Sequence, residues 1–330
     1  MNLTVFDGKK ILVTGASGLL GRALVSALLT YDTQNPPCVV ALVRNIEKAK
    51  TVFNDLPQAR LNLLVCDICE LAAEDMGVDY IIHCASHTAS KDFVARPVEV
   101  ISNSINGTKR VLDFAVKNNV ESVVYLSTME VYGTPSTDEK IYESSPTNLN
   151  SMKARSSYPE SKRLCECLCA SYFSEYGVPV KVVRLTQTFG EGVEYDDGRL
   201  FAELARCALE NRDIVLNTKG ETKRNYLYIG DAVEAIFTVL LKGVSGEAYN
   251  AADEQTYCSV YEMACMVAEN FGNGIRVLIN EAEDISRFGY APTLKMNLSA
   301  QKLQALGFTA KTHLKESFEK MIEYMRKHKK

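Results

Sequence analysis

Tyr158 and Lys162 are the first candidates for chemistry, because they lie four residues apart in the segment YPESK. The surrounding stretch has helical periodicity, and residues i and i+4 of a helix share one face. An ammonium group beside a phenol lowers the pKa of the phenol and can also hold a ribose. The tyrosinate can then take a proton from a hydroxyl group as hydride leaves. The pair alone is common by chance, so its meaning depends on the other motifs.

The segment LSTMEVYG brings Thr128, Met129 and Glu130 to the end of an apolar run. A thioether cannot donate a proton, so packing is the expected role of Met129. Glu130 has two interpretations. It is either a catalytic base, or a carboxylate bonded to backbone or ribose near the end of a strand.

The first apolar run of the chain ends in a glycine-containing turn, GASGLLG. Glycine tolerates a positive φ and lets a ligand approach the backbone closely. The start of the following helix offers unpaired N–H groups and a partial positive charge to a pyrophosphate. The spacing is GxxGxxG rather than GxGxxG, but its place between a strand and a helix indicates the same dinucleotide site. The expected contacts are Gly15, Ser17, Gly18, Leu19, Leu20 and Gly21.

Arg44 ends the second apolar run, where a residue that contacts the adenosine ribose is expected. An acid there would bind the 2′-hydroxyl of NAD, whereas an arginine suits the 2′-phosphate of NADP. The sequence therefore favours NADP over NAD, although a solvent-facing arginine is the alternative. Asp67, followed by Ile68, ends the third run and is the candidate for the adenine amino group.

These residues need a scaffold, and the first half of the chain alternates apolar runs with amphipathic segments. The runs are near-continuous rather than alternating, which is typical of buried parallel strands. Strand–helix alternation predicts an α/β fold, a Rossmann-type doubly wound parallel sheet, with a smaller mixed α/β substrate-binding lobe. The predicted strands are residues 9–15, 38–44, 61–67, 78–86, 121–128 and 180–185.

The pattern breaks after Leu185, and the second lobe is expected to be woven into the first. We assign residues 1–188 plus about 225–252 to the dinucleotide-binding domain. The substrate lobe then takes about 189–224 plus 253–330, and the chain closes with an amphipathic helix over 313–328.

With these motifs in place, the chain resembles the extended short-chain dehydrogenase/reductase family, in particular its NAD(P)-dependent nucleotide-sugar epimerases and dehydratases. The resemblance covers nearly the whole length. It rests on GASGLLG, HCAS, NGTKRVLDFA, YPESK, RLTQTFGEG, RNYLYIGDAVEAI and KLQALGF. The chain departs from the family pattern at Ser104, where asparagine is usual, at Gln187 and Thr188, which occupy the usual asparagine region, and at Glu191, where proline is usual.

The resemblance implies roles for residues of this chain. Tyr158 is the proton-abstracting tyrosine, Lys162 its partner, and Thr128 the hydroxyl that orients the 4-hydroxyl of a nucleoside-diphosphate sugar. The sugar is expected between the two lobes. The further cofactor contacts implied are Cys84, Ala85, Ser86 and Ser104. The further substrate contacts implied are Ser86, Met129, Gln187, Thr188, Arg199 and Arg224, of which Arg224 suits the diphosphate.

Met129 also bears on the reaction, because 4,6-dehydratases of this family carry an aspartate there that protonates the departing hydroxyl. The resemblance therefore favours transient C4 oxidation followed by epimerisation. The alternatives are a UDP-glucuronate-type decarboxylase or a 4,6-dehydratase that uses Glu130, and an NADPH-dependent 4-keto-sugar reductase. A dinucleotide sensor without catalysis is a further alternative, but such proteins typically lose the tyrosine or the lysine.

Composition places the chain among ordinary globular proteins, with 46% hydrophobic and 24% charged residues and a net charge of −4. It gives no reason to expect nucleic acid or an anionic membrane as a partner. The ten cysteines lack zinc-site spacing, so we expect free thiols and no metal. Without a signal peptide or a long apolar stretch, a cytosolic (cytoplasmic) protein is expected. The resemblance implies a homodimer.

Overall fold

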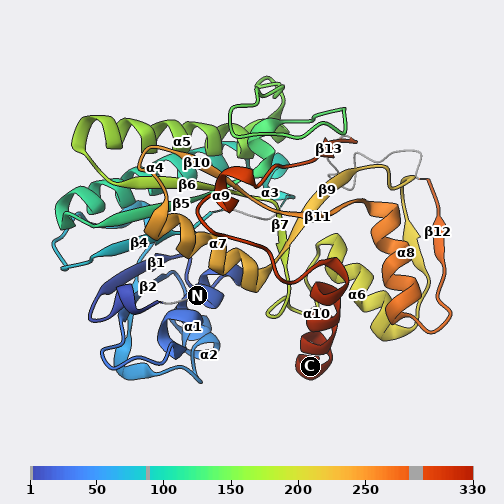
Figure 1. The fold of residues 1–330 in the computed structure, drawn as a ribbon, viewed down its shortest axis with the longest axis horizontal. Coiled ribbons are helices and arrows are strands. Elements are labelled where there is room, and N and C mark those ends of the chain that lie inside the picture. Colours follow the sequence, from blue (N-terminus) through green and yellow to red (C-terminus); the bar gives the residue numbers. More distant parts are fainter. Residues whose placement is uncertain (1–2, 87–89, 282–292, 330) are drawn as a thin grey trace.

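The structure is a computed structural model that describes residues 3–86, 90–281 and 293–329. Its centre is a seven-stranded parallel sheet in the order β10-β6-β5-β4-β1-β2-β3 (Figure 1). The strands are β1 (Lys10–Thr14), β2 (Cys38–Val43), β3 (Leu61–Val65), β4 (Tyr80–His83), β5 (Ser122–Thr128), β6 (Val180–Leu185) and β10 (Ala248–Ala251). The prediction of a Rossmann-type parallel sheet is confirmed, and of its seven strands only β10 was not predicted from the sequence.

Both faces of this sheet are covered by helices, which explains the near-continuous apolar runs. Along β1, Ile11 and Val13 face the apolar core under α1 (Leu19–Thr30) and α7 (Ile229–Lys242). The residue between them, Leu12, faces the opposite core under α4 (Pro97–Asn118) and α5 (Ser157–Tyr176). Figure 1 shows α4 and α5 on one side of the sheet, with α1 and α2 (Ile46–Val52) on the other.

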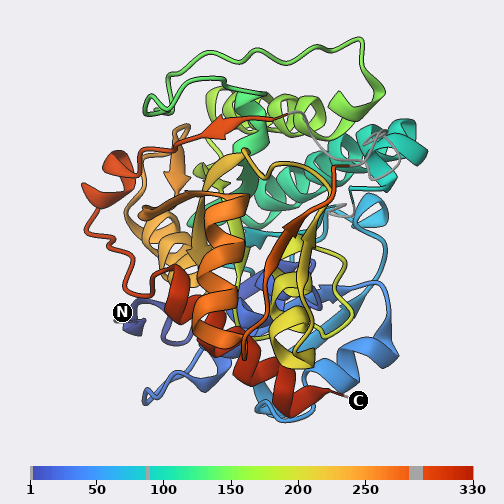
Figure 2. The same cartoon turned by 90° about the vertical axis from the view of Figure 1, so that its right-hand side faces the viewer.

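The second lobe is built on a smaller mixed sheet. In this sheet β9 (Lys223–Tyr228) pairs with β11 (Asp253–Ser259), β13 (Lys295–Met296) and β7 (Gln187–Phe189). A two-stranded ladder joins β8 (Ile214–Leu216) to β12 (Val277–Ile279). The helices are α6 (Leu200–Glu210), α8 (Val260–Phe271) and α10 (Leu314–His328), which face the viewer in Figure 2. They enclose an aromatic core in which Phe189 stacks on Phe201 and contacts Phe318.

The short elements are η1 (Thr4–Phe6), η2 (Gln58–Arg60), η3 (Ile68–Glu70), α3 (Asp92–Ala95), η4 (Met129–Tyr132), η5 (Ala154–Ser156) and α9 (Gln301–Gln304). The chain passes between the lobes more than once, because β9 lies in the mixed sheet while α7 and β10 return to the parallel one. The exact boundaries of the two domains stay a prediction.

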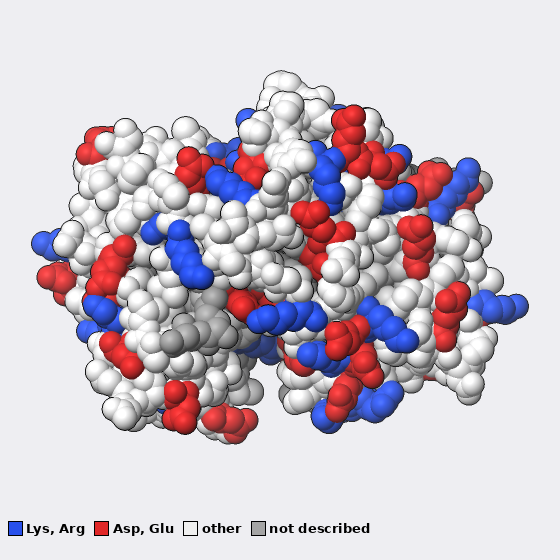
Figure 3. Space-filling model, in the orientation of Figure 1, with Lys and Arg blue, Asp and Glu red and all other residues white. Residues whose placement is uncertain are grey.

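The surface agrees with the balanced composition. Acidic and basic side chains are interspersed over the face seen in Figure 3. All ten cysteines are free thiols, and Cys167 on α5 is the exposed one. Among the described helices, none combines the length and the apolar character needed to cross a membrane.

Candidate active site

The glycine turn between β1 and α1 lies directly against the end of β4. Gly15 has φ +63°, and a Cβ there would lie 2.8 Å from the backbone of Ala85. Gly18 is the N-cap of α1, and among the described residues no side chain caps that end and no acid lies in its first turn. The free N–H groups and the close approach of the backbone fit a dinucleotide pyrophosphate. Of the neighbouring predicted contacts, Leu19 packs toward the second lobe and Leu20 toward the main core.

The end of β4 is tied to β1 and α4 by a buried hydrogen-bond chain. Thr14 Oγ1 lies 2.7 Å from His83 Nδ1 and accepts a bond from Ala85 N at 3.1 Å. His83 Nε2 lies 3.2 Å from Thr108 Oγ1. Burial, and next the charge of Lys162, lowers the pKa of His83 to about 3, so the ring is neutral. The sequence indicates His83 only as part of the motif HCAS. Its hydrogen bonds to Thr14 and Thr108, which hold the end of β4 in place, were not predicted.

The other predicted cofactor contacts stand near the carboxyl ends of neighbouring strands, where open α/β sheets bind ligands. Arg44 is exposed just after β2, and Asp67 accepts a bond from Cys69 N at 2.9 Å. Ile68 packs on α4 where a Cβ on Gly107 would lie 2.9 Å from its side chain. Ser104 donates its hydroxyl to Val100 O at 2.7 Å within α4.

Cys84 and Ser86 complete this group at the end of β4. Burial raises the pKa of the Cys84 thiol to about 12, so the side chain stays a neutral thiol. Ser86 is half-buried in the same turn. Their contacts with a cofactor stay predictions.

Tyr158 and Lys162 lie on one face of α5, as the spacing predicts. Lys162 is 3% exposed, and its Nζ donates to Leu126 O at 2.7 Å and lies 4.7 Å from the centre of the Tyr125 ring. Its Nζ is 6.0 Å from the centre of the Tyr158 ring. Burial lowers the pKa of Lys162 to about 8. The ammonium therefore lies beneath the tyrosine, anchored to β5.

The phenol of Tyr158 meets Thr128 and Glu130. Burial raises its pKa above the usual value, and the charge of Glu130 raises it further. A hydrogen bond with Thr128 and the charge of Arg155 act in the opposite direction. The structure thus brings the four predicted catalytic residues together at the end of β5. The cation whose charge lowers the pKa of the phenol is Arg155 and not Lys162, from which the spacing predicts that effect.

Thr128 ends β5 and caps the short helix η4, where its Oγ1 accepts a bond from Glu130 N at 3.3 Å. Met129 is 5% exposed and packs in an apolar cluster. Thr186 Oγ1 lies 3.4 Å from its sulfur. This is the packing position that the sequence predicts. A contact between Met129 and substrate stays a prediction.

Two residues of this corner were not predicted from the sequence, Phe93 and Arg155. The Phe93 ring stacks on Tyr158 with centroids 4.3 Å apart and planes 5° apart. Arg155 pairs its Nη2 with Glu130 Oε2 at 2.9 Å, and its Cζ lies 4.9 Å from the Phe93 ring centre. The position of Arg155, three residues before Tyr158, could have suggested a shared helical face. No spacing could have suggested Phe93.

The predicted sugar-side residues have different surroundings. Thr188 is buried and donates to Thr186 O at 3.1 Å, and Gln187 beside it in β7 is half-buried. Arg199 pairs with Asp197 at 2.6 Å. Arg224, in β9, has a buried Nε without a hydrogen-bond partner among the described residues. Arg224 is therefore the better placed of the two arginines to bind an anion.

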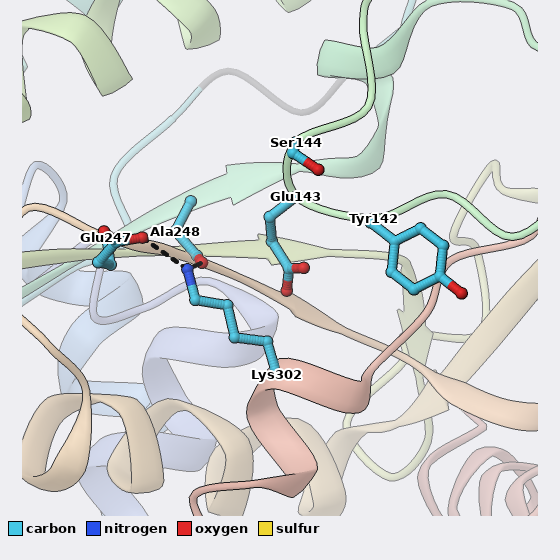
Figure 4. A pocket seen from close by; sticks show the side chains of 6 residues that line it. All are labelled: Tyr142, Glu143, Ser144, Glu247, Ala248 and Lys302. Atoms are coloured by element: carbon cyan, nitrogen blue, oxygen red, sulfur yellow. Dashed lines mark hydrogen bonds and ion pairs between the residues drawn. The ribbon is translucent and has the colours of Figure 1, made fainter.

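A polar pocket of about 440 Å³ lies apart from these residues. Lys302 in this pocket donates to Glu247 Oε2 at 2.7 Å and to Ala248 O at 2.8 Å (Figure 4). The pocket is lined by Tyr142, Glu143, Ser144, Glu247, Ala248 and Lys302. None of the predicted site residues lines it, so it does not enter the proposed chemistry.

Comparison with known proteins identifies the family. The model of the "NAD dependent epimerase/dehydratase family" matches residues 11–252. The mouse dTDP-D-glucose 4,6-dehydratase is 27% identical, over 97% of this chain and 89% of its own length. UDP-glucuronic acid decarboxylase 1 of Xenopus tropicalis is also 27% identical, over 97% of this chain and 73% of its own length.

Solved structures share the fold at lower identity. UDP-glucose 4-epimerase of Thermotoga maritima has a TM-score of 0.79 and 21% identity, over 97% of this chain and 100% of the other. UDP-glucuronic acid 4-epimerase of Bacillus cereus, in complex with NAD, has a TM-score of 0.78 and 21% identity, over 97% and 100%. From the family match over most of the chain, together with the glycine turn and the Tyr158–Lys162 pair, we conclude that this protein is an enzyme of the NAD-dependent epimerase/dehydratase family.

Proposed function

We propose that this enzyme oxidises C4 of a nucleoside-diphosphate sugar transiently and then epimerises it. The observation that carries the proposal is the meeting of Thr128 and Tyr158 at the end of β5, with the Lys162 ammonium anchored beneath them. The glycine turn lies at the same edge of the sheet. The decarboxylases, dehydratases and epimerases similar to this chain carry nucleotide sugars in their names.

In this reaction Tyr158 takes the proton of the C4 hydroxyl, which Thr128 orients by a hydrogen bond. Lys162 stabilises the phenolate and holds a ribose. NAD(P), when bound, supplies the hydride acceptor. The keto-sugar turns in the site, and the hydride would then return from the bound cofactor to the other face of C4 while Tyr158 returns its proton to the C4 oxygen. The product carries the opposite configuration at C4.

The binding roles follow the predicted positions. The turn over residues 15–21 would hold the pyrophosphate, and Arg44 would favour NADP by contact with a 2′-phosphate. Arg224, with its unpartnered Nε among the described residues, would bind the diphosphate of the sugar nucleotide. We place the sugar between residues 1–188 with 225–252 and residues 189–224 with 253–330.

Decarboxylation of a nucleotide-linked uronic acid is the second candidate. The observation that favours it over 4,6-dehydration is Met129, which fills the middle position with a buried thioether. Dehydration needs a proton donor there, whereas loss of CO2 from a 4-keto uronic acid makes less demand on that position.

The test is a screen of UDP-, dTDP-, GDP- and CDP-sugars with NAD or NADP, followed by nuclear magnetic resonance of the sugar and by the absorbance of the reduced cofactor. Epimerised sugar without net NADPH consumption supports the proposal, and released CO2 supports the second candidate. Net NADPH consumption would instead identify a reductase. We expect Tyr158→Phe to lower turnover by about 10²–10⁴-fold. Full turnover in that variant would exclude all three reactions.

We also propose a homodimer and a cytosolic location. The dimer is supported by exposed apolar side chains on α4 and α5, which include Val98 at 75% exposure, Ile101 and Leu164. Free thiols on every cysteine agree with a reducing compartment. If the dimer forms through these exposed side chains of α4 and α5, the double variant Val98→Asp with Leu164→Asp will be a monomer by light scattering.

A further inference from the structure

Arg155 is a cation inside the proposed sugar site that the C4 oxidation does not require. It lies in η5, and its side chain is 24% exposed. Its Nη2 is 2.9 Å from Glu130 Oε2. Its Nε is buried and has no hydrogen-bond partner among the described residues. Buried donors are nearly always bonded in native structures, so this N–H indicates a missing partner.

The guanidinium is held in place by more than the ion pair. It lies over the ring of Phe93, with its Cζ 4.9 Å from the ring centre, and the same ring stacks on Tyr158. Ser157 Oγ donates to Phe93 O at 2.9 Å and fixes that residue against α5. Arg155 is therefore oriented before a ligand arrives, which lowers the entropy cost of binding.

We propose that Arg155 binds a carboxylate on the sugar, so that the site selects a nucleotide-linked uronic acid over the neutral hexose. This inference rests on the proposed function and names its substrate class. Arg155 would act as a specificity-determining residue.

Two physical arguments favour an anionic partner. A guanidinium has five N–H donors arranged in a planar fork that matches a carboxylate, and the bond to Glu130 occupies only part of that fork. Glu130 alone would repel an acidic sugar, whereas the Arg155–Glu130 pair offers a neutral pair with an unused donor. A neutral hydroxymethyl group would leave the buried Nε without a charged acceptor, and sites built for a polar group discriminate strongly against ligands that lack it.

The alternative is that Arg155 only balances Glu130. In that case the preference for acidic sugars would be absent or would not depend on Arg155. The two possibilities differ in a binding ratio, which can be measured without turnover.

The experiment compares the Kd of UDP-glucuronic acid with that of UDP-glucose by calorimetry, on protein saturated with cofactor. The dTDP-linked pair is measured in parallel. The variants are Arg155→Met and Arg155→Lys, with Arg163→Met as the control. Arg163 is an arginine of α5 whose side chain is 42% exposed and pairs with Glu160.

We expect the wild type to bind the acidic sugar at least about tenfold more tightly than the neutral one. Arg155→Met should weaken the acidic sugar by about 10–100-fold, as expected for a charged hydrogen bond, and change the neutral sugar by less than about threefold. Arg155→Lys should retain part of the preference, and Arg163→Met all of it. Equal binding of the two sugars by the wild type, an unchanged preference in Arg155→Met, or no binding of either acidic sugar would overturn the inference.

The outcomes separate this inference from the proposed function. Conversion of a neutral sugar without any acidic preference would leave the function standing and remove the role of Arg155. A preference for acidic sugars that depends on Arg155, with no conversion of the bound sugar, would support the role of Arg155 and contradict the proposed function. Melting temperatures of the unliganded variants, measured alongside, show that each variant is folded.

Discussion

Lys162 is a charged group that the fold has taken out of water. It is 3% exposed, and its partners are a carbonyl oxygen of β5 and the faces of two tyrosine rings. The carbonyl oxygen and the two rings stabilise the positive charge less than water does, so burial lowers the pKa of Lys162 from 10.5 to about 8. Holding this cation under Tyr158 thus costs stability at neutral pH.

Replacing Lys162 by Met should remove this loss of stability. The difference in the free energy of unfolding between the wild type and the variant should then depend on pH. Between about pH 8 and 10.5 the unfolded chain keeps the proton at this position while the folded chain releases it, so the wild type gains stability as pH rises. Relative to Lys162→Met, the free energy of unfolding of the wild type should rise by about 3 kcal/mol over this range. Urea unfolding at several pH values measures the difference.

The exposed Lys117 provides the control for this measurement. Lys117→Met should differ from the wild type by a nearly constant amount over the same range. A constant difference for Lys162→Met as well would show that Lys162 is not the group that titrates.

At the scale of elements, the site depends on how closely β1, α1 and β4 approach one another. The turn after β1 has its backbone against the backbone of Cys84 and Ala85. At Gly15, φ +63° and the missing Cβ are both required, since the nearest atoms belong to backbone that cannot turn aside.

We therefore expect Gly15→Ala to disrupt the cofactor site. The strained φ costs about 1–3 kcal/mol, and the overlap with Ala85 adds to it. NADH binding, followed by its fluorescence, should weaken at least about tenfold, with a lower melting temperature. Gly198→Ala is the control, because nothing lies within 4 Å of its added Cβ and its φ is not positive. Normal NADH binding by Gly15→Ala would show that the turn can shift without loss.

Much of this arrangement could be predicted from the sequence, for a physical reason. Strands covered on both faces must be apolar at consecutive positions, as at Leu12 and Val13, so their runs are conspicuous. The site residues at strand ends follow from those runs. In contrast, β10 reads AYNA, without an apolar run, and its partner β6 lies far earlier in the chain. The stack of Phe93 on Tyr158 also joins segments that are far apart in the chain, and no local sequence pattern predicts such a contact.

At the scale of the whole molecule, Asn250 in β10 ties three distant segments together. Its side chain accepts a bond from Tyr132 OH at 2.7 Å and donates to Ile141 O at 3.1 Å and to Ser299 O at 3.2 Å. The backbone N of Asn250 donates to Glu143 Oε1 at 2.8 Å. Asn250 is fully buried and its three side-chain bonds are buried with it, whereas the bond to Glu143 is only partly buried.

Asn250→Ala should accordingly destabilise the protein by about 2–4 kcal/mol, because it leaves several buried polar groups without partners. Chemical denaturation measures this loss. The matched variant is Asn54→Ala, at an exposed asparagine that bonds its neighbour Asp55, and we expect a change within about 0.5 kcal/mol. Similar small losses in both variants would contradict the bridging role of Asn250.

The late arrival of β10 also matters while the chain is being made. Strand β6 ends at Leu185, and its outer neighbour begins at Ala248, so residues 186–247 must be synthesised before that edge is covered. At 5–20 residues per second this takes roughly 3–12 s, during which the nascent sheet presents an open apolar edge to other chains. Lys181 lies on that edge strand, and a charged side chain there discourages edge-to-edge pairing. We therefore expect Lys181, which is buried in the finished protein, to limit pairing of the open edge with other chains before β10 is in place.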